Sequence, residues 1–204
     1  MKGQASVLTM IIMTAMALVI SLAVWNLFMS TASIQREEAL IASALAREIA
    51  RISVNNLASV KVNDTAYRFA FQFVTMDYQP ATVYLMVLRS ATTSPTPVSF
   101  ALYEIESSAD ISNTSMLFQI SNLIINTEVI NTKYIMIRPA NSNEYAPLSV
   151  YYDATIMPYR IFLSGEPKCY IIEVSADDVS NYAQLVILIK INNKYYQIAT
   201  LPLY

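Results

Sequence analysis

The side chains that could do chemistry are scattered along this chain. Its carboxylates include Asp153, Glu166, Glu173 and the adjacent pair Asp177-Asp178, and no spacing among them forces two into one site. Histidine is absent, which removes His-based triads, the commonest general base and most zinc and copper sites. No Ser-x-x-Lys motif or glycine-rich phosphate loop occurs. We therefore predict a protein without enzymatic activity, metal or cofactor, in which Asp177-Asp178 is a solvated turn.

The single cysteine, Cys169, has no internal disulfide partner. It lies in the apolar stretch 168–172, which is typical of a strand. A cysteine in such surroundings is a small buried side chain with little reactivity. We predict that Cys169 is structural.

Two sequons are candidate modification sites. They are Asn63-Asp64-Thr65 and Asn113-Thr114-Ser115. If the domain that carries them lies outside the cell, Asn63 and Asn113 are acceptors for N-linked glycans, and the protein is a glycoprotein. Charged residues make up 14% of the chain, against about 25% in typical domains, so glycans would help to solvate its surface.

The element that organises the chain is its N-terminal segment. Residues 7–28 carry no charge, proline or glycine. A helix rises about 1.5 Å per residue, so this run covers the roughly 30 Å hydrocarbon core of a membrane. A cleaved secretory signal is the alternative, but its apolar core is usually about 7–15 residues and ends in small residues. Here Trp25, Asn26 and Phe28 resemble an interfacial belt instead.

The helix is predicted to continue into water as far as residue 55. The segment 30–53 lacks proline and glycine and is rich in good helix formers. Apolar residues recur on one face of this segment, namely Ile34, Ile41, Leu45, Ile49 and Ile52. A helix of this length is on the order of 75 Å long, and one small domain cannot cover it. The stripe therefore needs lipid or other copies of the same helix.

The residues before the apolar run resemble a known processing site. Lys2-Gly3-Gln4-Ala5-Ser6 is similar to the prepilin-peptidase site of archaeal type IV pilins and archaellins, in which a basic and a small residue precede the cut. The resemblance implies cleavage between Gly3 and Gln4, with residues 1–3 as a class III leader. The next position of that pattern is often Glu, and this chain has Leu8 there.

The resemblance, which covers roughly the first 55 residues, also implies an assembly. The precursor would lie in the cytoplasmic membrane, with Lys2 inside and the C-terminal domain outside. After cutting by prepilin peptidase, an assembly platform would build a homopolymer at the cell surface. The predicted filament-core residues of the helix are Leu8, Ile11, Ile12, Ala15, Leu18, Val19, Leu22, Trp25, Ile34, Ile41, Leu45 and Ile49.

Residues 58–204 are predicted to form an Ig-like antiparallel β-sandwich, which makes the fold class α+β. All 14 tyrosines lie here, with many Val, Ile and Thr residues. The pair Asn192-Asn193 predicts a tight hairpin turn. Turns or loops between strands are expected at 77–80, 91–97, 139–147 and 165–167. The segment 110–130 fits a helix as well as a strand. The candidate strands are 59–62, 67–76, 82–89, 98–106, 133–138, 149–152, 154–163, 168–174, 184–191 and 195–201.

Three functions remain open from the sequence. The first is a structural subunit of an archaeal type IV pilus-like filament, used for adhesion or contact between cells. The second is a membrane-anchored external domain that acts as an accessory or anchoring component of a surface machine. The third is an accessory subunit of a membrane enzyme. Nucleic acid is not expected as a partner, because the net charge is only −2 and no basic tract is present.

Overall fold

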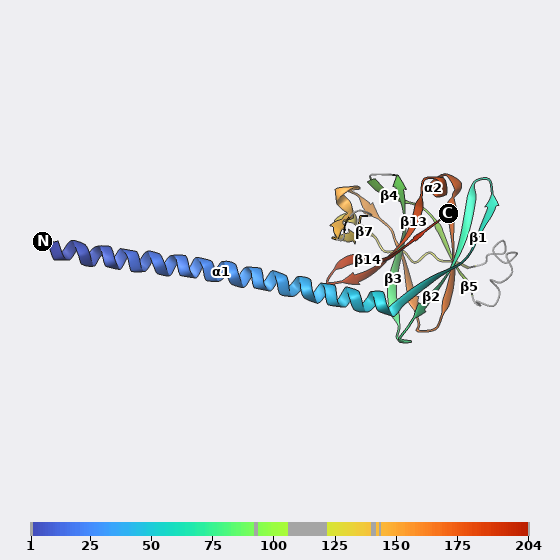
Figure 1. Cartoon of the computed structure of the whole chain (residues 1–204). Helices are drawn as coiled ribbons and strands as arrows, with labels where there is room; N and C mark the ends of the chain where they lie inside the picture. Colours follow the sequence, from blue (N-terminus) through green and yellow to red (C-terminus); the bar gives the residue numbers. More distant parts are fainter. Residues whose placement is uncertain (1, 92–93, 106–121, 140–141, 143, 204) are drawn as a thin grey trace. The chain divides into compact units, whose positions relative to one another are not determined.

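The computed structural model describes residues 2–91, 94–105, 122–139, 142 and 144–203 (Figure 1). The chain divides into two compact units, Met1–Ala44 and Leu45–Tyr204. The first unit is helical. The second contains the last turns of the same helix and the β-rich domain. The predicted α+β class, a long N-terminal helix followed by antiparallel sheets, is confirmed.

Helix α1 extends from Lys2 to Arg51 and spans 50 residues. It ends before the predicted residue 55, because strand β1 (Ile52–Asn63) follows it directly. Ile52 pairs with Thr75, and the Met76 N–H donates to the Arg51 carbonyl at 2.8 Å. Residues 52–55 include β-branched Ile52 and Val54, which suit a strand better than a helix. Pairing with the neighbouring strand therefore ends the helix.

The first sheet has five strands in the order β1-β2-β12-β5-β6, all paired antiparallel. Its other members are β2 (Ala66–Thr75), β12 (Lys168–Ser175), β5 (Ala101–Ile105) and β6 (Asn122–Leu123). Strand β1 lies at one edge, and its pairing with β2 carries two register shifts, at Asn56/Ala58 and Lys61/Asn63.

The second sheet has the order β11-β3-β13-β14-β8-β9, with β4 also paired to β3. Its strands are β3 (Ala81–Ala91), β4 (Ser94–Val98), β8 (Ile135–Ile137), β9 (Ala146–Pro147), β11 (Tyr159–Leu163), β13 (Ala183–Ile191) and β14 (Lys194–Pro202). Among the described strands, β14 and β8 form the one parallel pair. A short separate ribbon joins β7 (Ile130–Asn131) to β10 (Thr155–Ile156).

The two sheets bury large side chains at alternate positions of their central strands. Phe69, Phe71 and Phe73 of β2 are at most 1% exposed. The rings of Phe73 and Tyr170, on neighbouring strands, meet edge to face at 5.6 Å. On one face of the second sheet, every second residue of two strands is likewise buried, namely Val83, Leu85 and Val87 of β3, and Leu185, Ile187 and Ile189 of β13. Such burial is expected of the inner faces of a sandwich-like arrangement.

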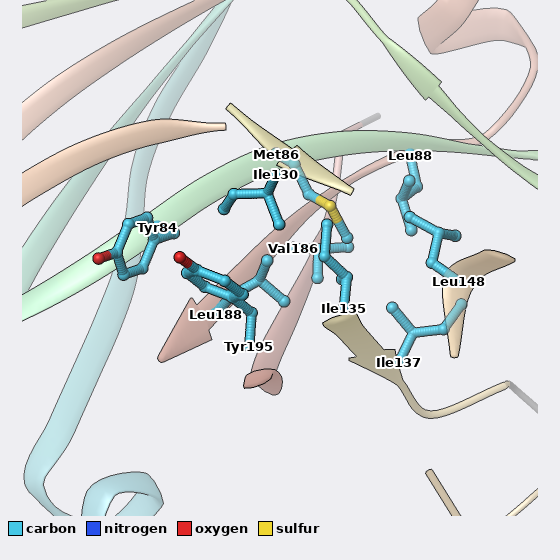
Figure 2. Close-up of a cluster of buried hydrophobic side chains, with 10 residues drawn as sticks. All are labelled: Tyr84, Met86, Leu88, Ile130, Ile135, Ile137, Leu148, Val186, Leu188 and Tyr195. Carbon is cyan, nitrogen blue, oxygen red and sulfur yellow. The ribbon is translucent and has the colours of Figure 1, made fainter. Parts of the chain in front are cut away.

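A second core covers the opposite face of β3 and β13 (Figure 2). Its members are Tyr84, Met86, Leu88, Ile130, Ile135, Ile137, Leu148, Val186, Leu188 and Tyr195, all at most 5% exposed. Ile130 and Leu148 come from the segment between β5 and β11, so that segment covers this face. Both faces of the central strands are therefore apolar, and their sequences read as continuous runs rather than as alternation.

Several local predictions are wrong, including three that concern the type of element. The break predicted at 91–97 contains strand β4, where Pro95 and Pro97 are tolerated because the strand pairs on one side only. The strand predicted at 149–152 is instead the 3-10 helix η4 (Leu148–Val150). Asp177 and Asp178 lie in the short helix α2 (Ala176–Ser180) rather than a turn, because Ser175 caps it by accepting from the Asp178 N–H.

The predicted hairpin at Asn192-Asn193 is confirmed, since both residues have positive φ, 48° and 64°. Within the ambiguous segment 110–130, the described part contains β6 and begins β7, and residues 110–121 lie outside the described residues.

Candidate functional site: the exposed apolar helix

The apolar part of α1 exposes large side chains in every direction. Consecutive residues Ile11, Ile12 and Met13 are 60%, 48% and 67% exposed. Successive helical residues point about 100° apart, so the described residues leave every face of this segment exposed. From Thr9 to Arg51 the helix is long and apolar enough to cross a membrane, and its most apolar window has no buried residue. An uncovered apolar surface of this size requires lipid or a partner.

Several hydroxyl groups within this helix are satisfied by its own backbone. Thr14 donates to the Met10 carbonyl at 2.8 Å, and Ser21 donates to the Ala17 carbonyl at 2.8 Å. Such bonds to the preceding turn allow Ser and Thr to lie in an apolar environment without an unpaired donor. The helix therefore presents few unsatisfied groups to lipid or to another helix.

Most residues of the predicted filament-core set are exposed, as a surface for another molecule requires. Trp25 and Ile34 are 60% and 55% exposed, Ile49 is 44% exposed and Ile41 is half-buried. The exposed members in the apolar segment are Ile11, Ile12, Ala15, Leu18, Val19, Leu22 and Trp25. The side chain of Leu8, also a member of the predicted set, lies outside the part of the chain that the structure describes.

Leu45 differs from the other members of the set. Its side chain is only 6% exposed, and it belongs to the unit Leu45–Tyr204. A side chain already buried in its own unit is not available to another copy. Leu45 therefore packs within the folded unit, and its assignment to the filament core stays a prediction.

Arg51 fastens the end of α1 to the turn after β2. Its Nε lies 2.7 Å from Asp77 Oδ2, and its Nη2 donates to the Pro80 carbonyl at 2.8 Å. The predicted pairing with Glu48 is also present at 3.3 Å. Burial acts to raise the pKa of Asp77, but hydrogen bonds from Arg51 and the Gln79 N–H outweigh it and lower that pKa. The sequence did not reveal the contact with Asp77, because no pattern in the segment 52–76 joins the two residues.

Gly3 and Gln4, the predicted processing residues, lie in the first turn of α1. No acidic residue occupies that turn. The structure therefore places the proposed cut at the beginning of a continuous helix, directly before its apolar segment.

The two predicted glycan acceptors differ in what the structure describes. Asn63 is exposed at the turn between β1 and β2, where its Oδ1 accepts from the Thr65 N–H at 2.9 Å and from the Thr65 hydroxyl at 2.8 Å. Asn113 lies outside the described residues. Asn63 is thus accessible to a modifying enzyme.

Titratable groups do not gather into a metal site in the part of the chain that the structure describes. No three carboxylate or thiol side chains there are close enough to hold an ion. Cys169 is 2% exposed, which confirms the predicted burial, and burial raises the pKa of its thiol. The exposed helix is thus the most conspicuous feature available for function.

No protein-family model, curated protein or solved structure matches this chain.

Proposed function

We propose that this protein is a structural subunit of a type IV pilin-like surface filament of the archaeal kind. The precursor is held in the cytoplasmic membrane by α1 and cut between Gly3 and Gln4. The mature subunit then polymerises through α1 and displays its β domain for adhesion or contact between cells. The observation that carries this proposal is the apolar helix that has no covered face.

The exposure pattern favours assembly over simple anchoring. A bilayer needs about 20 apolar residues, whereas α1 has 50 residues and exposes Ile34, Leu40 and Ile49 well beyond the apolar run. Copies of the same helix would cover both the apolar segment and this continuation. Contacts between different faces of identical helices leave each end open to another copy, so such an assembly can extend indefinitely.

The join between helix and domain supports the same function. The last turns of α1, Leu45–Arg51, belong to the unit Leu45–Tyr204, which we call the β unit. The buried side chain of Leu45 and the ion pair of Arg51 with Asp77 attach these turns to the unit. A load applied along a filament would therefore reach the domain through a packed and ion-paired segment rather than through a loose linker.

The deciding measurement is the N-terminal mass of the protein sheared from the surface of native cells. A chain that starts at Gln4 supports both processing and assembly. An intact Met1 found only with membranes contradicts the proposal and favours the membrane-anchored accessory domain. Gly3→Phe should block the cut and keep the protein in the membrane, whereas Gly3→Ala retains a small residue and should be processed.

A second pair of variants tests the helix surface. Ile34→Glu places a charge on the apolar stripe and should prevent filament formation while the cut subunit accumulates in the membrane. Gln35→Glu adds the same charge one position away, on a polar part of the helix, and should leave filaments intact. Equal filament yields from both variants would contradict assembly through the stripe.

A further inference from the structure

A cleft of about 570 Å³ lies on the β domain, well apart in sequence from the apolar helix. One wall comes from β7 and the 3-10 helix η3 (Thr132–Tyr134), and the other from the β13–β14 hairpin. Its volume is within the range of about 300–1,000 Å³ that small-molecule sites occupy.

The floor of the cleft is part of the packed core. Ile130 and Tyr195 line it, are 3% and 5% exposed, and belong to the second core shown in Figure 2. The rings of Tyr195 and Tyr84 meet edge to face at 4.9 Å. A floor held by core packing keeps its shape whether or not a ligand is present, which reduces the ordering cost of binding.

The charges of Lys190 and Glu128 at the cleft cancel one another. Lys190, which lines the cleft, has its Nζ 3.5 Å from Glu128 Oε1, and the Tyr195 hydroxyl donates to the same carboxylate. The bond from Tyr195 holds the pKa of Glu128 below its ordinary value, and a bond with Tyr195 raises the pKa of Lys190. Both groups are therefore charged at neutral pH, and the pair offers no net charge to a ligand.

The walls supply an aromatic ring and neutral polar groups. The Tyr134 ring is 43% exposed, with the Lys133 Nζ 4.9 Å from its centroid. Asn131 accepts from the Lys133 N–H through Oδ1 at 3.0 Å, which leaves its amide NH₂ free to donate. Among the described residues, no intramolecular hydrogen bond engages the Thr155 hydroxyl or the Asn193 amide.

We propose that this cleft binds an uncharged pyranose ring. A pyranose has an apolar C–H face that can stack on the Tyr134 ring, and a rim of hydroxyl groups that match the amides of Asn131 and Asn193. Thr155 adds a hydroxyl that both donates and accepts. Lys190 and Glu128 cancel one another, and the third charged group, Lys133, lies against the face of the Tyr134 ring. We therefore expect a neutral sugar to bind more tightly than a carboxylate or a phosphate. This binding does not depend on filament assembly, so either proposal can fail alone.

The test uses the full-length chain in dodecylphosphocholine micelles, because the headgroup of that detergent carries no sugar. Methyl glycosides of glucose, galactose, mannose and N-acetylglucosamine are titrated, and binding is followed by saturation-transfer NMR. At least one should bind saturably with a Kd on the order of 1 mM. Glucuronate and inorganic phosphate are the charged probes and should bind more weakly.

Variants locate the binding. Tyr134→Ala should weaken it by about tenfold, the upper range for one aromatic contact, and Tyr134→Phe should retain it. Asn193→Gly keeps the positive φ of the turn while it removes the amide, and should weaken binding about threefold with unchanged thermal unfolding. Phe162→Ala removes an aromatic ring of 59% exposure outside the cleft and serves as the control.

Three results would overturn the proposal. They are the absence of saturable binding by every methyl glycoside, equal binding by the wild type and Tyr134→Ala, and tighter binding of either charged probe than of any neutral sugar. The first of these results overturns the proposal even if a larger surface glycan binds, because a single ring is the ligand proposed.

Discussion

Replacing Leu45 by alanine tests whether the end of α1 is part of the folded β unit. Leu45 is 6% exposed, so the substitution removes buried apolar groups and leaves a cavity. Such changes usually cost about 2–5 kcal/mol, and we expect about 2–3 kcal/mol because Leu45 is the first residue of its unit. In a unit of this size each kcal/mol lowers the Tm by about 2–4 °C, which predicts a Tm lower by roughly 5–10 °C.

The matched control is Ile49→Ala, one turn further along the same helix. Ile49 is 44% exposed, so much of its apolar surface is already in contact with water. Ile49→Ala should therefore lower the free energy of unfolding by about 1 kcal/mol or less. The higher helix propensity of alanine offsets part of the lost burial. If the proposed assembly is correct, Ile49→Ala should nevertheless reduce filament yield.

The assay is thermal unfolding of the full chain in micelles, followed by near-ultraviolet circular dichroism. All 14 tyrosines lie at or after Tyr67, so this signal reports mainly on the β unit. If Leu45→Ala melts like the wild type, or if Ile49→Ala lowers the Tm by as much, then Leu45 does not contribute to the core as its burial indicates.

Three further predictions concern the β unit. The pKa of Glu128 is lowered, chiefly by the hydrogen bond that its carboxylate accepts from Tyr195. The ionised carboxylate therefore stabilises the fold above about pH 4.3, and this stabilisation is lost as the pH falls through the pKa of Glu128 in the folded protein. Glu128→Gln should flatten the dependence of Tm on pH in that range, and a profile equal to that of the wild type would contradict the prediction. Gly165→Ala should lower the free energy of unfolding in urea by about 2 kcal/mol or more, because Gly165 has φ +104° and an added Cβ would lie 2.3 Å from the Tyr78 carbonyl oxygen. A stability equal to that of the wild type would contradict this prediction and show that the turn can relax. Cys169 should react with a thiol reagent only as fast as the unit opens, since its thiol is buried and its pKa is raised; rapid labelling of the folded protein would refute this.

Local patterns in the sequence predicted the elements that depend on neighbouring residues. The long helix follows from the absence of proline and glycine over 4–55 and from good helix formers. The strands β2, β3, β12, β13 and β14 were expected close to their observed bounds, because apolar runs with β-branched and aromatic residues favour strands. The Asn192-Asn193 hairpin was also predictable, since asparagine tolerates positive φ.

Contacts between distant residues decided the rest. The helix ends at Arg51 because Ile52 pairs with Thr75, and Pro95 and Pro97 enter a strand because β4 pairs with one side of β3. The existence and apolar character of α1 were thus determined by the sequence alone, since propensity and hydropathy act along the chain. The burial of Leu45 and the neutral cleft beside Tyr195 depended on the tertiary structure, because burial and charge pairing arise only when separate segments pack together.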